Sequence, residues 1–259
     1  RDLISKKESL EQEKKNISKQ KEIKNFEKSK EISSKIDNIS KSHNKIKKML
    51  NEKLYFLPNV ALDDVPVGKN ESSNKLIRQY GTIKKFEFDL KSHHDLGKKD
   101  KMIDLDPSVK LSGARFSILR DKFALLERAL INLMLDIHTQ KFGYIEISPP
   151  LIVNEEVMFG TGQLPKFEED QFEIKLENQN TKKYLIPTAE VVLTNLVRDS
   201  ILNKKELPLR FVASTPCFRK EAGSYGKDTS GLMRQHQFYK VELVSIVENE
   251  KCINELDRM

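Results

Sequence analysis

The chain has 259 residues, 37% of them hydrophobic and 33% charged, which is enough for one large domain with an appendage and more polar than an average globular domain. Its formal charge of +7 lies in the first 60 residues, which hold 16 Lys and Arg against 9 Asp and Glu, whereas the other 199 residues hold 30 of each. With only two cysteines, the chain has no disulfide framework, and no spacing of Cys and His residues predicts a metal site. No apolar run is long enough to span a bilayer. We therefore expect a cytoplasmic protein without a membrane partner.

The first 57 residues contain neither Gly nor Pro, as a pair of long helices requires. Apolar residues recur there at alternating spacings of three and four, which predicts the seam of a two-stranded coiled coil. The residues of this seam are Leu3, Leu10, Ile17, Ile32, Ile36, Ile39, Ile46 and Leu50. The spacing breaks around residues 21–26, so we predict an antiparallel helical hairpin that reverses there. A single long helix that pairs with a second copy is the alternative.

The positive charge of this helical segment indicates a polyanionic partner, with nucleic acid the first candidate. A solvated, lysine-rich helix surface explains the same charge equally well. Pro58 ends the second helix, and residues 59–74 have the composition of a linker. We therefore predict an N-terminal domain of residues 1–100, with the arm at about residues 1–57, and a second domain of residues 101–259.

The second domain begins with an amphipathic segment over residues 116–142, which predicts a helix closed by Gly143 at its C-terminal cap. Short strand-like runs follow at residues 144–147, 151–153, 184–186, 210–215 and 237–247. The last two runs are spaced as in a hairpin, which favours an antiparallel sheet. A helix followed by strands, without a repeating βαβ pattern, predicts an α+β fold.

Chemistry-bearing residues gather in the last two of these runs. If the first run extends to Glu221, Arg219 and Glu221 lie two apart and share a strand face, and Phe238 and Glu242 share a face of the partner strand. A guanidinium, two carboxylates and an aromatic ring on one sheet face can hold a nucleoside triphosphate. A surface ion pair and a core phenylalanine would explain any one of these residues, but not the set of four.

The segment that carries these residues reads FRKEAGSYGKDTSGLMRQHQFYKVE and resembles motif 2 of the class II aminoacyl-tRNA synthetases, in the form typical of bacterial seryl enzymes. Residues 143–153, GYIEISPPLIV, resemble motif 1 of the same class. Residues 160–167 and 185–195 resemble the substrate-side segments of the seryl enzymes, and the helical arm also matches in place. The resemblance covers essentially the whole chain.

The resemblance implies a helical coiled-coil arm that binds tRNA, followed by an antiparallel sheet flanked by helices. It implies ATP-dependent activation of L-serine to seryl-adenylate and transfer of serine to the 3′ end of tRNA(Ser). Thr188, Ala189 and Glu190 would bind the serine amino group, and Glu242 the serine side. The residues implied for ATP are Arg219, which would also be the catalytic residue, Lys220, Glu221, Gln235 and Phe238.

The loop between the two strands, with Lys227 and Arg234, is implied to meet the tRNA acceptor end. The arm lysines assigned to tRNA are Lys14, Lys15, Lys19 and Lys21. Pro150 stands at the family's proline position in motif 1, which implies a homodimer. Magnesium would accompany ATP, and the resemblance implies that its ligands lie downstream of Met259.

The family's motif 3 does not occur in these residues, so we expect the 259 residues alone to be inactive in adenylate formation. A catalytically dead synthetase-like module that binds tRNA and ATP is the alternative function. A purely structural coiled-coil protein is a third reading, but it gives no reason for Arg219, Glu221, Phe238 and Glu242 to share a face.

Overall fold

A computed structural model describes residues 1–19, 24–99, 101–176, 181–222 and 232–259. The chain divides into two compact units, Arg1–Lys75 and Leu76–Met259. The functional boundary after residue 100 stays a prediction. Among the helices that the structure describes, none combines the length and apolar character needed to cross a membrane.

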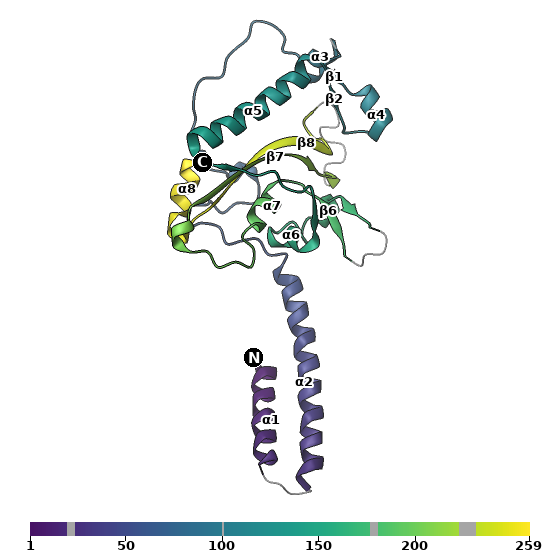
Figure 1. Ribbon diagram of the computed structural model, residues 1–259, viewed down its shortest axis with the longest axis vertical. Helices are drawn as coiled ribbons and strands as arrows, with labels where there is room; N and C mark the ends of the chain where they lie inside the picture. The colour runs from purple at the N-terminus through teal and green to yellow at the C-terminus, as the bar shows by residue number, and fades with distance from the viewer. Residues whose placement is uncertain (20–23, 100, 177–180, 223–231) are drawn as a thin grey trace. The chain divides into compact units, whose positions relative to one another are not determined.

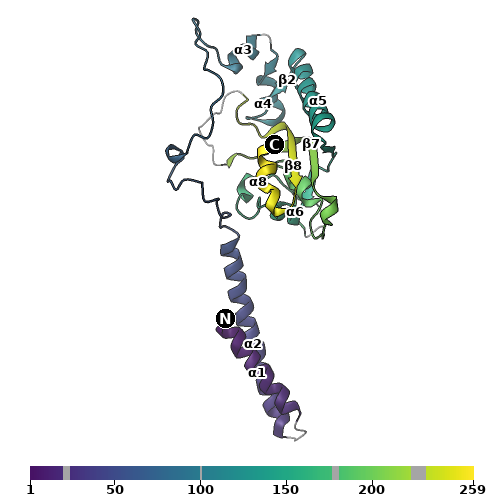
Figure 2. The ribbon, with the colours of Figure 1, turned by 90° about the vertical axis from the view of Figure 1, so that its left-hand side faces the viewer.

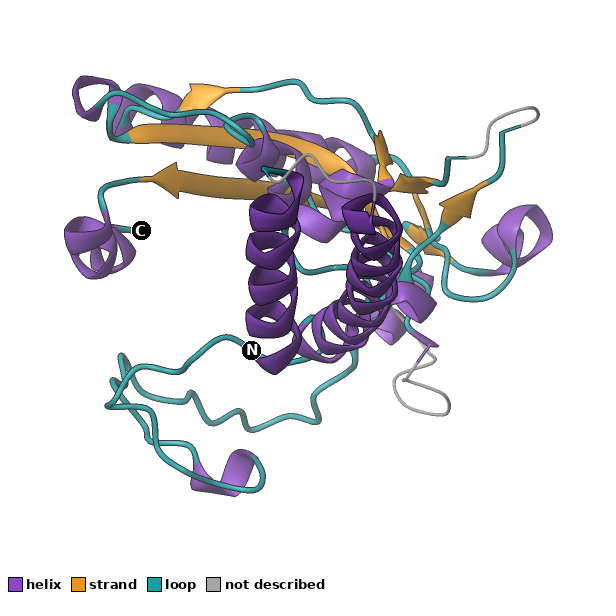
Figure 3. Cartoon of the chain, turned by 90° about the horizontal axis from the view of Figure 1, so that it is seen from below, coloured by secondary structure: helices purple, strands orange, loops and turns teal. Residues whose placement is uncertain are grey.

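The first unit is a pair of helices, α1 (Asp2–Ser18) and α2 (Lys24–Leu54), which lie side by side in Figure 3. Their antiparallel direction is evident from an ion pair of 3.3 Å between Glu13, near the end of α1, and Lys28, near the start of α2. Ile32 of the predicted seam is only 3% exposed. The predicted hairpin is therefore confirmed, although the reversal itself falls in residues 20–23, outside the described residues. A short 3₁₀ helix, η1 (Glu71–Ser73), follows α2 in this unit.

The second unit is built around a three-stranded sheet in the order β3 (Ile145–Glu146), β7 (Leu209–Phe218) and β8 (Gln237–Ile246). β7 and β8 form the predicted antiparallel hairpin over ten paired residues. β3 runs parallel to β7, so the sheet is mixed rather than purely antiparallel as predicted. The α+β fold class is confirmed.

Helices cover both faces of this sheet: α5 (Lys122–Phe142) lies on one side and α7 (Glu190–Asn195) on the other (Figure 1). The helix α6 (Glu155–Gly160) packs against α7. The predicted helix over residues 116–142 is wrong at its start, because Ile118 and Leu119 pair in a strand with Ile103 and Asp104. Asp121, at a φ of +49°, then turns the chain into α5. Gly143 closes the helix in the left-handed conformation, as predicted.

The remaining elements form two small groups. The helices α3 (His93–Lys99) and α4 (Asp106–Ser112) gather with β1 (Ile103–Asp104) and β2 (Ile118–Leu119) at the N-terminal end of α5 (Figure 2). A second sheet has the order β4 (Ile152–Asn154), β6 (Lys183–Leu185) and β5 (Glu173–Ile174). The 3₁₀ helices η2 (Glu168–Asp170), η3 (Lys204–Glu206) and η5 (Asn249–Lys251) and the helix α8 (Cys252–Arg258) complete the unit.

The apolar core lies between the two sheets and the short helices. One cluster packs Met158 of α6 and Val191 of α7 against Tyr184 of β6, all of them fully buried. A second cluster packs Ala189 and Leu193 against Phe211 and Ala213, on the face of β7 that α7 covers. Because α7 is held on this face by its apolar side, the polar residues just before it are placed beside the β7–β8 hairpin.

Candidate functional site

The face of the β7–β8 hairpin that α7 covers changes from apolar to polar along its length. Side chains of β8 at every second position, Phe238, Lys240 and Glu242, stand on this face. Their direct partners on β7 are Cys217, Thr215 and Ala213, in that order. Opposite these small partners, the three larger side chains of β8 are only partly buried.

Cys217 is fully buried in this floor, and its burial raises the pKa of the thiol. The thiol therefore stays protonated near neutral pH and does not supply a thiolate nucleophile.

Arg219 follows β7 directly and is held from several sides. Its backbone N–H donates to the His236 carbonyl at 2.9 Å, and its Nε donates to the Pro187 carbonyl at 3.1 Å. Its guanidinium lies 5.2 Å from the centre of the Phe238 ring. A cation and an aromatic ring are thus brought together at the end of the hairpin, as the sequence predicts.

Thr188 connects this hairpin to the start of α7. Its hydroxyl donates to Glu242 Oε2 at 2.6 Å and accepts from Lys240 Nζ at 2.8 Å and from the Glu190 N–H at 3.2 Å. Lys240 also forms an ion pair with Glu242. Because a hydroxyl offers one donor and two acceptor positions, Thr188 is fully used, and its orientation is fixed.

A cavity of about 350 Å³ lies beside Thr188 and Arg219. The residues that line it are Gln163, Phe167, Asp170, Gln171, Pro187, Thr188, Arg219 and Glu221. The volume is in the range of small-molecule and cofactor sites. The cavity joins the hairpin end to residues 163–171, which lie far from the hairpin in the sequence.

Glu221 reaches the cavity by a route that differs from the predicted one. β7 ends at Phe218, and Glu221 has a φ of +53°, so the two-residue strand alternation expected for Arg219 and Glu221 does not apply. Glu221 instead pairs with Arg234 Nη1 at 3.1 Å, and its carbonyl accepts from Arg115 at 3.1 Å. The two predicted residues still line the same cavity because the chain turns there.

The other residues assigned by sequence lie as follows. Ala189 is buried, and Glu190, the first residue of α7, is exposed. The Lys220 ammonium group lies 5.8 Å from the centre of the Phe172 ring, and the Gln235 side chain accepts a hydrogen bond from Ser117. Pro150 is exposed between β3 and β4. Lys14 is partly exposed, and Lys15 and Lys19 are exposed. Of the residues assigned by sequence, Thr188, Arg219 and Glu221 line the cavity. Phe238, Glu242, Arg234, Glu190, Lys220, Gln235 and Ala189 are not among its lining residues. Lys21 and Lys227 lie outside the described residues.

The sequence missed the residues on the far wall of the cavity. Gln171 is 2% exposed, and its Nε2 donates to the Phe167 carbonyl. Among the described residues, its Oε1 has no hydrogen-bond partner, so it presents an acceptor near the cavity. Asp170 holds the turn after Arg219 by accepting from the N–H groups of Lys220 and Ala222. Their identity as wall residues depends on tertiary packing, which no local pattern reveals.

A metal site is a separate question. In the part of the chain that the structure describes, no three His, Cys, Asp or Glu side chains gather where they could hold a metal ion. We therefore assign no metal ligands among these residues.

Comparison with known proteins agrees with this architecture. Residues 172–259 match the family model described as the tRNA synthetase class II core domain (G, H, P, S and T). The whole chain is 59% identical to the serine–tRNA ligase of Pelagibacter ubique, and 83% of it is 51% identical to that of a Sulfurihydrogenibium species. The chain spans 62% and 51% of the lengths of these two relatives.

Two solved structures are similar over the full chain. One is the seryl-tRNA synthetase of Pyrococcus horikoshii complexed with ATP, with a TM-score of 0.87 and 32% identity, of which this chain covers 63%. The other is the cytoplasmic serine–tRNA ligase of Naegleria fowleri in complex with AMP, with a TM-score of 0.84 and 26% identity, of which it covers 61%.

Proposed function

Since the chain belongs to the seryl-tRNA synthetase family of class II enzymes, we propose that it forms the tRNA-binding arm and a large part of the active site of a serine–tRNA ligase. The observation that carries this proposal is the single cavity shared by Arg219, Thr188 and Glu221, with the Phe238 ring 5.2 Å from the guanidinium. The relatives that this chain matches are longer, so the complete reaction is proposed for the full-length protein.

In the proposed reaction, the serine carboxylate attacks the α-phosphate of ATP and displaces pyrophosphate. Arg219 binds the α-phosphate and the incoming carboxylate, and its fixed position lets it neutralise charge without reorganising. Phe238 stacks on the adenine ring, and Glu221 accepts a hydrogen bond from the adenine amino group. The 3′-terminal ribose hydroxyl of tRNA(Ser) then attacks the acyl carbon and releases AMP. Magnesium would neutralise phosphate charge during this chemistry.

Selection of serine is assigned to Glu242, to which the Thr188 hydroxyl donates, and Thr188 belongs to the loop proposed for the serine amino group. The hydroxyl of a bound amino acid donates a hydrogen bond to an acceptor in the site. An analogue without the hydroxyl leaves that acceptor unpaired, and such sites reject the smaller analogue strongly. Glu242 supplies this acceptor, because its side chain is only 20% exposed. Ala189 and Glu190 lie at the start of α7, where Glu190 offers negative charge for the serine ammonium group.

The direct test is serine-dependent exchange of pyrophosphate into ATP by the full-length protein. We expect exchange with serine and little with alanine or threonine, followed by serine transfer to tRNA(Ser). ATP and tRNA binding without any exchange would instead identify a catalytically dead binding module. Absence of ATP binding would overturn the assignment of the cavity.

We also propose that the arm formed by α1 and α2 binds tRNA through its lysines. Helical RNA is recognised mostly by shape and phosphate contacts, and each neutralised phosphate adds to the salt dependence of binding. Replacing Lys14, Lys15 and Lys19 by glutamine should weaken tRNA binding and lower the slope of log K against log salt by about 2 to 3. Filter binding from 50 to 200 mM salt measures this slope, as in typical protein–nucleic acid titrations.

A matched control for the arm replaces three exposed lysines of the other unit, Lys110, Lys175 and Lys205, by glutamine. The control changes the net charge equally, so an effect of net charge alone would lower both slopes alike. An equal fall in the two variants would favour the alternative that the arm lysines are only a solvated helix surface.

The exposed apolar face of α5 is proposed as part of a homodimer interface. Leu125, Leu126, Leu130 and Leu133 are each about half exposed, at 47% to 55%. Pro150, at the proline position of motif 1, is exposed as well. Exposed apolar side chains gathered on one helix are typical of protein–protein interfaces. We place the resulting dimer in the cytoplasm.

A further inference from the structure

Lys240 lies at the centre of the site and has no role in the proposed reaction as described so far. It stands on the same face of β8 as Phe238 and Glu242, two residues from each. Its side chain is 31% exposed, so it is neither a core residue nor a freely solvated lysine. Opposite it on β7 stands Thr215, whose side chain is short.

The ammonium group of Lys240 joins two elements of the site. It donates to Thr188 Oγ1 at 2.8 Å, just before α7, and pairs with the Glu242 carboxylate on its own strand. Thr188 in turn donates to Glu242 Oε2 at 2.6 Å. The three side chains form a closed triangle, in which each one restricts the other two.

The two contacts on Glu242 fall on the same oxygen, Oε2. Within the described residues, Oε1 receives no hydrogen bond, so it can accept one from a ligand. Without a neighbouring cation, a carboxylate this shielded from water would attract any ammonium group that came near it. Paired with Lys240, it is a charge-balanced acceptor that suits a neutral hydroxyl donor.

We propose that Lys240 is a positioning and specificity residue, which holds Thr188 and Glu242 in the orientation that recognises the substrate hydroxyl. This inference rests on the proposed function, in which Glu242 binds the serine side chain. Lys240 acts through these two residues rather than on the reacting atoms. Replacing Lys240 should therefore weaken recognition of the serine hydroxyl and leave unchanged the contacts that serine and alanine have in common.

The test compares the wild-type full-length protein with Lys240→Met and Lys240→Arg, and measures exchange with serine and with alanine. A hydrogen bond to a charged group contributes enough that its loss should lower kcat/KM for serine by about 10- to 100-fold, mainly through KM. The kcat/KM for alanine and the KM for ATP should stay within about 2-fold of wild type, a margin set by the small effects of surface changes. Lys240→Arg keeps a charged donor and should recover part of the loss.

The outcomes separate this inference from the proposed function. If the wild-type protein shows no serine-dependent exchange, the proposed function fails first. If the wild type is active and Lys240→Met reduces serine and alanine alike, or lowers only kcat, Lys240 acts on the shared chemistry and the inference is overturned. Unchanged kinetics of Lys240→Met with serine would also overturn it.

Tyr239→Phe is the matched control, because Tyr239 is the next residue on β8, points to the opposite face and is 50% exposed. It should leave the ratio of kcat/KM for serine and alanine unchanged. A fall in this ratio for Tyr239→Phe would mean that any disturbance of β8 produces the effect, which contradicts a specific role for Lys240.

Discussion

Replacing Arg219 by alanine in the full-length protein is expected to reduce serine-dependent pyrophosphate exchange by roughly 10³-fold or more. Arg219 is the cation that the structure fixes between Phe238 and the Pro187 carbonyl, at the edge of the cavity. In the proposed reaction it stabilises negative charge that builds up on the α-phosphate, so its removal lowers kcat more than it weakens ATP binding. Steady-state exchange kinetics with saturating serine, ATP and pyrophosphate measure this loss.

Two further variants make the result specific. Arg219→Lys keeps the charge but loses the planar pair of donors, so we expect an intermediate loss. Arg198→Ala removes an exposed arginine whose 3.5 Å ion pair with Asp199 is solvated, and it should retain wild-type exchange. The tRNA affinity of Arg219→Ala should remain near wild type, because the arm is proposed to supply most of the phosphate contacts. An equal loss of exchange and tRNA affinity would contradict the role given to Arg219.

The sequence predicts the hairpin face well because strand alternation is a local property. Phe238 and Glu242 share a face of β8 as expected, and the pairing of β7 with β8 follows from their spacing. The same alternation also contains Lys240, at the position between these two residues. Sequence reasoning passed over Lys240 because a lysine is usually solvated, and only the contact with Thr188 gives it a role.

Other parts of the site depend on backbone geometry that the residue pattern does not encode. Glu221 adopts a positive φ and leaves the strand, although its spacing from Arg219 suggested a shared strand face. Gln171 and Asp170 reach the cavity because a separate segment packs across the end of the hairpin. Likewise, α5 starts at Lys122 because β2 takes the residues before it. In each case a tertiary contact overrides a local preference.

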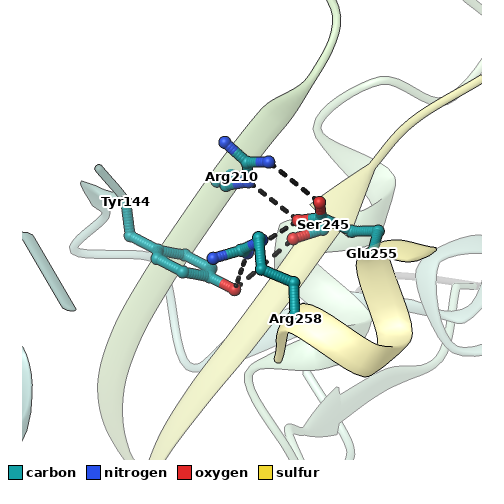
Figure 4. A network of polar contacts seen from close by, with 5 residues as sticks. All are labelled: Tyr144, Arg210, Ser245, Glu255 and Arg258. Atoms are coloured by element: carbon teal, nitrogen blue, oxygen red, sulfur yellow. Dashed lines mark hydrogen bonds and ion pairs between the residues drawn. The ribbon is translucent and has the colours of Figure 1, made fainter. Parts of the chain in front are cut away.

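Replacing Glu255 by glutamine is expected to lower the free energy of unfolding of the chain by about 3 kcal/mol near neutral pH. Glu255 of α8 is 8% exposed and accepts from Arg210 Nε and Nη2 at 2.7 and 2.8 Å and from Arg258 Nη2 at 2.6 Å (Figure 4). Arg258 also donates to the Tyr144 hydroxyl at 2.7 Å, so the network ties β7, α8 and the start of β3 together. Without the carboxylate, two partly buried guanidinium groups face each other without a counter-charge. This figure is the lower end of the usual cost of removing one partner from a buried ion pair, because the side chains of Arg210 and Arg258 remain 25% and 30% exposed.

The contribution of Glu255 should depend on pH in a defined direction. Hydrogen bonds from Arg210 and then from Arg258 hold the pKa of this carboxyl far below its ordinary value of 4.5. A carboxyl whose pKa is lower in the folded than in the unfolded state stabilises the fold above the unfolded pKa, and this stability is lost as the pH falls below it. Urea unfolding at pH 7, 4 and 3 should therefore show the wild type losing its advantage over Glu255→Gln as the pH drops below about 4.5. As a control, Glu250→Gln, at an exposed neighbouring position, should change the free energy of unfolding by less than about 0.5 kcal/mol. A difference in unfolding free energy between wild type and Glu255→Gln that stays constant across this pH range would mean that shape rather than charge supports the network.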